Sequence, residues 1–256
     1  MKKVLPDGNP CFYTPQHMAS KEAGMFSIDK DVFDVLPTLC VGLVVAHSID
    51  NTKDYPAVDG VLDKAVDEAR ERLSGMNASE DPRVQPYREA FHALGMSPSR
   101  YPSSNIALLR RIVKGKALWR VNPVVDLGNA ISIGYGVPLG AHALETPDEH
   151  LELRFSRPDD VFIALGEDAP DPTLEPGELV YAVGNLVHTR RWTWRQSENG
   201  KIVPETTSVA FPIDGFADRN LDQVECACGD LKKELEDIFG CTATFALAEA
   251  EHPIVA

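Results

Sequence analysis

NPVVDLGN (residues 122–129) and GVPLGA (residues 136–141) are the stretches on which the interpretation of this chain depends. Asn122 followed by proline is typical of a helix start, because asparagine caps the first turn and proline suits the first helical position. On this helix Asp126 and Asn129 are three residues apart and therefore share a face. The second stretch places glycines on both sides of a proline, which predicts a rigid turn with exposed backbone N–H groups.

The segment that leads into this helix, residues 90–125, contains no Asp or Glu although the chain has a formal charge of −14. Its basic side chains are Arg100, Arg110, Arg111, Lys114, Lys116 and Arg120. We call this segment the basic island. It indicates one contact with a polyanion, where Lys and Arg replace the counterions of a phosphate backbone. The alternative is that the cations complement a helix dipole, which explains Arg111 and Lys114 but not the continuation to Arg120.

A second basic cluster, RRWTWR at residues 190–195, interleaves tryptophan with arginine on an expected strand at residues 187–195. This composition suits stacking on exposed bases, and it makes Arg191, Trp194 and Arg195 candidates for contact with an unpaired stretch of nucleic acid. The alternative is an ordinary amphipathic strand with tryptophan in the core.

The composition is that of a soluble globular protein, with 43% hydrophobic and 25% charged residues among 256. No apolar run is long enough to span a membrane and no secretory signal is present, so we expect a cytoplasmic protein. The five cysteines are expected to be reduced, and neither a metal nor a cofactor is predicted. Residues 1–20 are aperiodic and contain QHMAS, which is typical of an expression-vector junction. We interpret them as an irregular leader that need not be native.

Hydrophobic periodicity predicts an α+β fold in a single domain, residues 21–256. Helices are expected mainly in the first half, and a mostly antiparallel sheet in the second. The expected helices are residues 31–36, 58–73, 81–94, 105–114, a helix from 122, and 221–239. The expected strands are residues 24–29, 38–47, 151–155, 161–165, 179–183, 187–195, 207–213 and 242–247.

Three residues are candidates for catalysis: Asn129, Asp126 and His142. A buried Asp must be partnered or functional, so Asp126 belongs either to the site or to a structural network with an arginine. A His in a loop is either a general base or incidental. We find no Ser-His-Asp or Cys-His arrangement for nucleophilic catalysis.

Further motifs carry a family resemblance: LGMSP (94–98), PSS (102–104), LLRR (108–111), NPVVD (122–126), PLGA (138–141), GELVY (177–181), RWTWR (191–195) and residues 206–215. With these motifs the chain resembles the tRNA-editing module of the bacterial phenylalanyl-tRNA synthetase β subunit, formed by its third and fourth domains. It resembles the free-standing proteins of that family more closely still.

The resemblance implies an α+β editing domain that hydrolyses wrongly charged aminoacyl-tRNA. Asn129 matches an asparagine that lines the synthetase editing pocket. Our candidates for substrate binding are Ser104, Asn122, Gly136, Gly140, Glu178 and Asp214. The synthetase has His where this chain has Gly140. Its pocket Glu, which recognises the tyrosine hydroxyl, falls near Pro212, where Asp214 is the nearest acid. The resemblance therefore does not imply specificity for tyrosine; some free-standing relatives act on canavanyl-tRNA for arginine.

These observations predict a trans-acting aminoacyl-tRNA deacylase whose partner is tRNA, without DNA, a membrane or a protein partner. An aminoacyl ester is already activated, so one positioned water and a stabilised oxyanion suffice, with help from the neighbouring ribose hydroxyl. One alternative is a non-catalytic RNA- or nucleotide-binding module. The other is a hydrolase of a small amino-acid derivative, which leaves the basic island unexplained.

Overall fold

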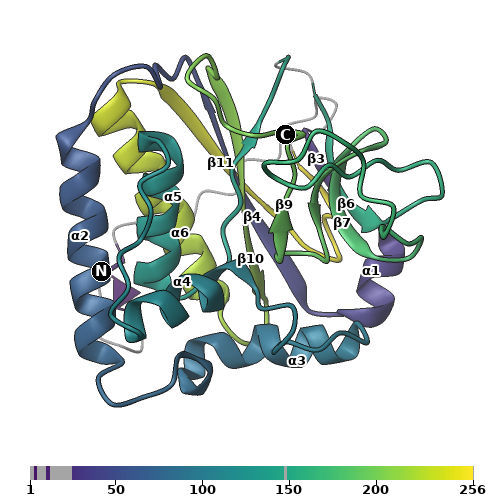
Figure 1. Ribbon diagram of the computed structural model, residues 1–256, viewed down its shortest axis with the longest axis horizontal. Helices are drawn as coiled ribbons and strands as arrows, with labels where there is room; N and C mark the ends of the chain where they lie inside the picture. The colour runs from purple at the N-terminus through teal and green to yellow at the C-terminus, as the bar shows by residue number, and fades with distance from the viewer. Residues whose placement is uncertain (1–2, 5–9, 12–24, 147–148, 256) are drawn as a thin grey trace.

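The computed structural model describes residues 3–4, 10–11, 25–146 and 149–255. Most of the expected leader, residues 1–20, lies outside the described residues. Within it, β1 (Lys3–Val4) and β2 (Pro10–Cys11) pair antiparallel. The rest of the described chain forms an α+β fold in which helices and a second sheet lie on opposite sides of a central sheet (Figure 1).

The central sheet has the strand order β11 (Thr242–Ala248), β4 (Leu39–His47), β10 (Ser208–Phe216) and β5 (His142–Ala143), and all its pairs are antiparallel. Strand β4 is buried on both faces, as its continuous apolar run predicts. Cys40 and Val44 belong to the core on the helical side, whereas Val41 and Val45 belong to the core shared with the second sheet. This alternation makes β4 the centre of the molecule.

Four of the helices form two layers on one side of the central sheet (Figure 1). Helices α5 (Pro123–Tyr135) and α6 (Leu221–Glu234) contribute to the core next to the sheet, and α6 continues as the π-helical turn η3 (Leu235–Phe239). Helices α2 (Pro56–Arg72) and α4 (Ser104–Val113) pack against α5 through a separate core. The approach of α6 is close: a Cβ at Gly42 would lie 2.3 Å from Cys228 Sγ. Glycine is therefore required there for packing.

The second sheet has the order β12 (Ile254–Val255), β3 (Phe26–Ile28), β6 (Leu151–Phe155), β7 (Leu179–Val183), β8 (Leu186–Arg190) and β9 (Arg195–Gln196). Among its described pairs only β3 with β6 is parallel. The short helices are α1 (Lys30–Val35), η1 (Ala78–Glu80), η2 (Pro82–Val84) and α3 (Gln85–Ala93). The predicted α+β class, with helices mainly in the first half and mostly antiparallel strands, is confirmed.

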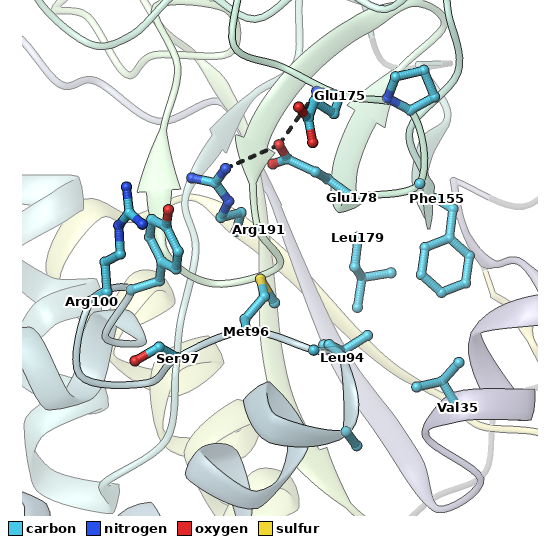
Figure 2. A pocket seen from close by; sticks show the side chains of 15 residues that line it. Val35, Leu94, Met96, Ser97, Arg100, Phe155, Glu175, Glu178, Leu179 and Arg191 are labelled. Carbon is cyan, nitrogen blue, oxygen red and sulfur yellow. Dashed lines mark hydrogen bonds and ion pairs between the residues drawn. The ribbon is translucent and has the colours of Figure 1, made fainter.

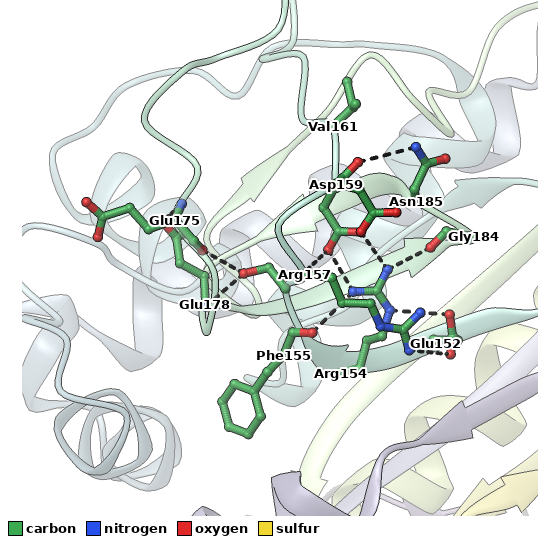
Figure 3. A network of polar contacts seen from close by, with 12 residues as sticks. Glu152, Arg154, Phe155, Arg157, Asp159, Val161, Glu175, Glu178, Gly184 and Asn185 are labelled. Atoms are coloured by element: carbon green, nitrogen blue, oxygen red, sulfur yellow. Dashed lines mark hydrogen bonds and ion pairs between the residues drawn. The ribbon is translucent and has the colours of Figure 1, made fainter.

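The expected strand at residues 161–165 is wrong, because only two isolated bridges, Val161 with Leu186 and Ala164 with Ser197, form there. Buried Arg154 anchors the chain at Asp160, directly before this segment (Figure 3). Its Nη1 and Nη2 donate to Asp160 at 2.7 and 2.9 Å, and Nη2 also donates to the Gly184 carbonyl at 2.6 Å. The ion pairs of Arg154, and not the backbone hydrogen bonds of a strand, anchor the chain there.

The expected strand at residues 187–195 is interrupted by a turn between β8 and β9. Arg191 and Trp192 have positive φ angles of 51° and 60°, which a strand does not permit. The turn buries the Trp192 side chain completely. Burial of this indole offsets the cost of the left-handed backbone, which is about 1–2 kcal/mol per residue.

Two further expectations need correction. The helix expected at residues 81–94 begins as the 3-10 turn η2, and α3 starts only at Gln85. The cysteines are not all reduced, since Cys226 is disulfide-bonded, whereas Cys40, Cys228 and Cys241 are free and buried. An odd number of cysteines does not exclude one bonded pair.

Candidate functional site

A cavity of about 300 Å³ lies where α5 meets the ends of both sheets, and we call it the central cavity. Helix α5 contributes Asn129, β10 contributes Asp214, and the turn after β8 contributes Trp192 to its wall. The predicted site residues that line it are Ser104, Asn129, Gly140, His142, Asp214, Trp194 and Arg195. Residues from distant parts of the sequence therefore meet in one cavity.

Asp214 is buried in this cavity and is held by two donors. Tyr181 Oη and Trp192 Nε1 each donate to Asp214 Oδ1 at 2.6 Å. The backbone is fixed as well, because Tyr87 Oη donates to the Asp214 carbonyl at 2.9 Å. Burial raises the pKa of Asp214 to about 7, and the two hydrogen bonds only partly oppose that rise. The carboxyl group is therefore near its titration midpoint at neutral pH.

His142 is completely buried, and neither ring nitrogen has a hydrogen-bond partner among the described residues. Its ring lies between those of Tyr181 and His188, with centroid distances of 5.6 and 5.5 Å. Burial lowers the pKa of His142 well below its usual range, so the imidazole is neutral, with one N–H donor and one acceptor nitrogen. A Cβ at Gly140 would lie 2.8 Å from His142 Nε2, so glycine makes room for this ring.

Two of the other buried polar atoms that lack a partner among the described residues are Thr193 Oγ1 and Gln196 Nε2. Both residues line the central cavity. Thr189 Oγ1 donates to Gln196 Oε1 at 3.2 Å. A buried polar atom without a partner costs about 1–3 kcal/mol. Unsatisfied atoms that gather on one cavity are therefore typical of a site where a ligand completes the hydrogen bonds.

Helix α5 places Asn129 in the cavity but keeps Asn122 and Asp126 out of it. Asn122 caps the helix, since its Oδ1 accepts from the Val125 N–H at 3.0 Å. Asp126 Oδ1 accepts from the Val121 N–H at 3.1 Å, and burial raises the pKa of this carboxyl. Both side chains fix the start of α5, and Asn129, one turn later, lines the wall.

Gly136 also lies outside the cavity, at the end of α5. Its φ of 70° is left-handed, and its carbonyl accepts from Asn105 Nδ2 at 2.7 Å. This bond ties the start of α4 to the end of α5. The contribution of Gly136 to the site is therefore indirect.

Glu178 lines a separate hollow of about 560 Å³ together with Arg100 and Arg191 (Figure 2). Its carboxylate binds Arg190 through Nε at 3.0 Å and Nη2 at 2.5 Å, and Arg191 Nη2 lies 3.3 Å away. Glu178 is thus engaged by two arginines. Glu178 does not line the central cavity.

A stack of aromatic rings and guanidinium groups connects this hollow with the central cavity. The Arg191 guanidinium lies 4.1 Å from the centre of the Tyr101 ring and 5.2 Å from that of Trp194. The rings of Tyr101 and Trp194 meet edge to face at 4.9 Å, and Arg195 lies 5.8 Å from the Trp194 ring. The RRWTWR cluster therefore presents a cationic aromatic edge at the cavity.

The basic island is not uniform. Arg120 is paired with Asp59 and Asp63, at 3.4 and 2.5 Å. Arg111 lies 3.6 Å from the centre of the exposed Trp119 ring, and partial burial lowers the pKa of Arg110. The exposed cations of the island are Arg100, Lys114, Lys116 and Arg120.

The sequence interpretation missed several cavity residues: Tyr181, Thr189, Trp192, Thr193, Gln196 and Lys201. Trp192 and Thr193 belong to the RRWTWR cluster, but a straight strand would place their side chains on opposite faces and so does not predict that both line one cavity.

The structure also bears on the expectations about metal ions and membranes. The described residues contain no group of three or more His, Cys, Asp or Glu placed to hold a metal. None of their helices combines the length and apolarity that a membrane span requires.

Comparison with known proteins places this geometry in a family. The B3/4 domain family matches residues 86–230, which include α5, the central cavity's loop and most of the second sheet. No curated protein matches the chain. The crystal structure of an N-terminal fragment of the phenylalanyl-tRNA synthetase β-subunit from Pyrococcus horikoshii is similar, with a TM-score of 0.49 and 9% sequence identity. The match covers 90% of this chain and 52% of that chain, so the chain spans about half the length of that fragment.

Proposed function

Because the chain belongs to the B3/4 domain family, we propose that it is a trans-acting aminoacyl-tRNA deacylase of the cytoplasm. The observation that carries the proposal is the central cavity, whose lining residues His142, Thr193 and Gln196 have buried polar atoms without a partner in the described part of the chain. Asn129 and Asp214 line the same cavity. A cavity of this kind, mostly apolar with a few polar groups, suits one small organic group.

The reaction is hydrolysis of the ester between an amino acid and the terminal ribose. The oxygen of a water attacks the carbonyl carbon, the bond to the ribose oxygen breaks, and the proton of the water passes to that oxygen. The ester is activated, so the protein has to position the water and stabilise the oxyanion. Asn129 supplies an amide N–H donor for the oxyanion or holds the water.

His142 is suited to orient the attacking water rather than to store its proton. Its imidazole is neutral because burial lowers the pKa of the ring well below its usual range. The acceptor nitrogen can receive a hydrogen bond from the water, and the neighbouring ribose hydroxyl can take part in the proton transfer.

The amino-acid side chain is proposed to be polar. Of the acids near the motif, Asp126, Glu145, Glu178 and Asp214, only Asp214 lines the central cavity. Hydrogen bonds to a charged partner contribute about 1.5–3 kcal/mol each. Canavanine, whose oxyguanidine has a much lower pKa than the guanidinium of arginine, fits such a site. We propose canavanyl-tRNA for arginine as substrate, with little action on arginyl-tRNA.

The tRNA is proposed to approach over the cationic aromatic edge. Trp194 and Arg195 line the central cavity, and Arg100 and Arg191 extend the stack away from it. Stacking of the unpaired terminal nucleotides on such an edge directs the ester toward the cavity. The exposed lysines of the basic island then contact backbone phosphates.

The test is hydrolysis of a panel of mischarged tRNAs by the purified protein and by two variants. We expect Asn129→Ala to lower deacylation by about 100-fold if the amide serves the oxyanion. Asn185→Ala removes an amide at an exposed position and is expected to leave the rate unchanged. The proposal fails if the wild-type protein hydrolyses no member of the panel, or if both variants behave alike.

A further inference from the structure

We infer that the central cavity binds an uncharged amino-acid side chain that carries a hydrogen-bond acceptor, and that Gln196 and Thr193 determine this specificity. The inference rests on the proposed function and deepens it, because it names the chemical class of the side chain. It excludes a permanently charged guanidinium from the same place. The argument comes from which polar atoms of the cavity are donors and which are acceptors.

Gln196 Nε2 is a buried donor without a partner among the described residues. Thr189 Oγ1 donates to Gln196 Oε1 at 3.2 Å, so in the structure the NH₂ group is the end of the amide that does not face Thr189. An amide NH₂ group only donates, so the ligand must supply an acceptor oxygen or nitrogen. A guanidinium has five N–H donors and no acceptor. It would leave Gln196 unsatisfied and place two donor groups against each other.

Thr193 Oγ1 and the ring of His142 restrict the choice of ligand less than Gln196 does, since each can donate or accept a hydrogen bond. Both residues are more than nine-tenths buried, with exposed fractions of 7% and 0%. The neutral ring of His142 adds no negative charge that would attract a cation. An amide, a urea or a neutral guanidine can satisfy these atoms and Gln196 together.

The charges around the cavity also disfavour a cation. Arg195 and Lys201 line it, and Lys201 is balanced by Glu198 at 3.1 Å. Asp214 is the carboxyl among the described lining residues, and its Oδ1 already accepts from Tyr181 and Trp192. A permanent cation would thus meet another cation and a carboxyl group whose Oδ1 is occupied.

The test compares two amino acids of nearly equal shape, arginine and citrulline, in which a urea replaces the guanidinium. Each is attached to the same tRNA, and the rates of ester hydrolysis by the wild-type protein are measured. One buried donor left without an acceptor changes binding by roughly tenfold or more. We therefore expect citrullyl-tRNA to be hydrolysed at least about tenfold faster than arginyl-tRNA.

Two variants assign the preference to the named residues. Gln196→Glu replaces the donor by an acceptor and is expected to reverse the preference toward arginine. Thr193→Val keeps the shape of the side chain and is expected to slow citrullyl-tRNA hydrolysis while the protein stays folded, because Oγ1 has no partner to lose. Gln223→Glu on α6, a half-buried position outside the central cavity, is the matched control and should leave the ratio unchanged.

Binding of the two amino-acid amides, argininamide and citrullinamide, measured by calorimetry, separates this inference from the proposed function. If the wild-type protein hydrolyses no ester but binds citrullinamide more tightly, the deacylase proposal fails and the inference holds. A wild-type preference for arginine, in hydrolysis or in binding, overturns the inference. An unchanged ratio in Gln196→Glu overturns it as well.

Discussion

Trp192 Nε1 donates to Asp214 Oδ1 across 2.6 Å, and it does so from a left-handed backbone with φ of 60°. The turn that carries this indole leaves β8 after Arg190, whereas Asp214 stands on β10 in the other sheet. The hydrogen bond therefore joins the two sheets at the central cavity. A strained turn that sets the position of a buried carboxyl group is characteristic of functional sites.

Asp214→Asn should change how the stability of the protein depends on pH. Burial raises the pKa of Asp214 from 3.8 to about 7, so the folded protein binds this proton more tightly than the unfolded chain does. Wild-type stability therefore falls as pH rises from about 4 to about 7, by at most about 4 kcal/mol at about 1.4 kcal/mol per pKa unit. Asparagine still accepts from Trp192 and Tyr181 but has no proton to lose, so the variant lacks this fall.

Urea unfolding of both proteins between pH 4 and pH 8 measures the difference, in which all other titrating groups cancel. Asp171→Asn is a control that should show no trend over this range. Hydrogen bonds from Thr173 lower the pKa of Asp171 below its usual 3.8, so its contribution to stability is fully present above about pH 4 and is lost only at lower pH. A difference between wild type and Asp214→Asn that stays constant over this range would contradict the prediction.

Arg191→Gly should be more stable than Arg191→Ala. Both variants lose the guanidinium, so the comparison isolates the backbone, whose φ is 51° at this position. Glycine occupies the left-handed region without the strain of a Cβ, which costs other residues about 1–2 kcal/mol. At Arg195, which lies in β9, the order should reverse because glycine weakens a strand. Thermal unfolding of the four variants gives both differences, and equal stabilities of the Arg191 pair would exclude strain there.

His142→Phe should raise stability and lower deacylation. The substitution removes two buried nitrogens without partners and keeps a ring between Tyr181 and His188. We expect a gain of about 1 kcal/mol at neutral pH. The gain should grow below about pH 6.5, since the pKa of the folded His142 is lowered and only the unfolded chain then binds the proton.

His188→Phe is the matched control for this prediction. His188 also has a buried ring nitrogen without a partner among the described residues, and burial lowers its pKa to about 4. It does not line the central cavity. The control should therefore gain stability without losing activity, and equal activity losses in both variants would remove His142 from the site.

Much of the fold follows from local patterns in the sequence. Asn122 caps α5 as expected, and the apolar run at residues 39–47 forms the buried strand β4. Both depend on neighbours along the chain, which a single sequence displays. The loop at residues 156–178 could not be predicted in this way, because Arg154 holds it through Asp160 and the Gly184 carbonyl. The apolar residues of this loop have the sequence pattern of a strand, although no strand forms there.

The candidate site, like the fold, could be predicted from the sequence only in part. Asn129, His142 and Asp214 stand in or near motifs that the sequence displays, and the structure brings them to one cavity. Thr193 and Gln196 were missed because a missing hydrogen-bond partner is a property of the folded structure alone. Asp126 was grouped with Asn129 by helical spacing. Its carboxylate instead turns to the Val121 N–H, a local bond at the start of α5 that spacing does not reveal.

The basic island gives the last prediction, because its cations differ in how they are neutralised. Lys114 and Lys116 are exposed, whereas Arg120 is paired with Asp59 and Asp63 at 3.4 and 2.5 Å. A cation that contacts a phosphate releases counterions, so each lost contact flattens the dependence of log K on log salt by about 0.7–0.9. The double variant Lys114→Ala, Lys116→Ala should reduce the slope by about twice that amount. Arg120→Ala should change it little, since Asp59 and Asp63 already balance its charge. Filter binding of tRNA between 50 and 200 mM salt, roughly the range in which such contacts weaken, measures both slopes. A steeper loss for Arg120→Ala than for the lysine pair would place the phosphate contact at Arg120 instead.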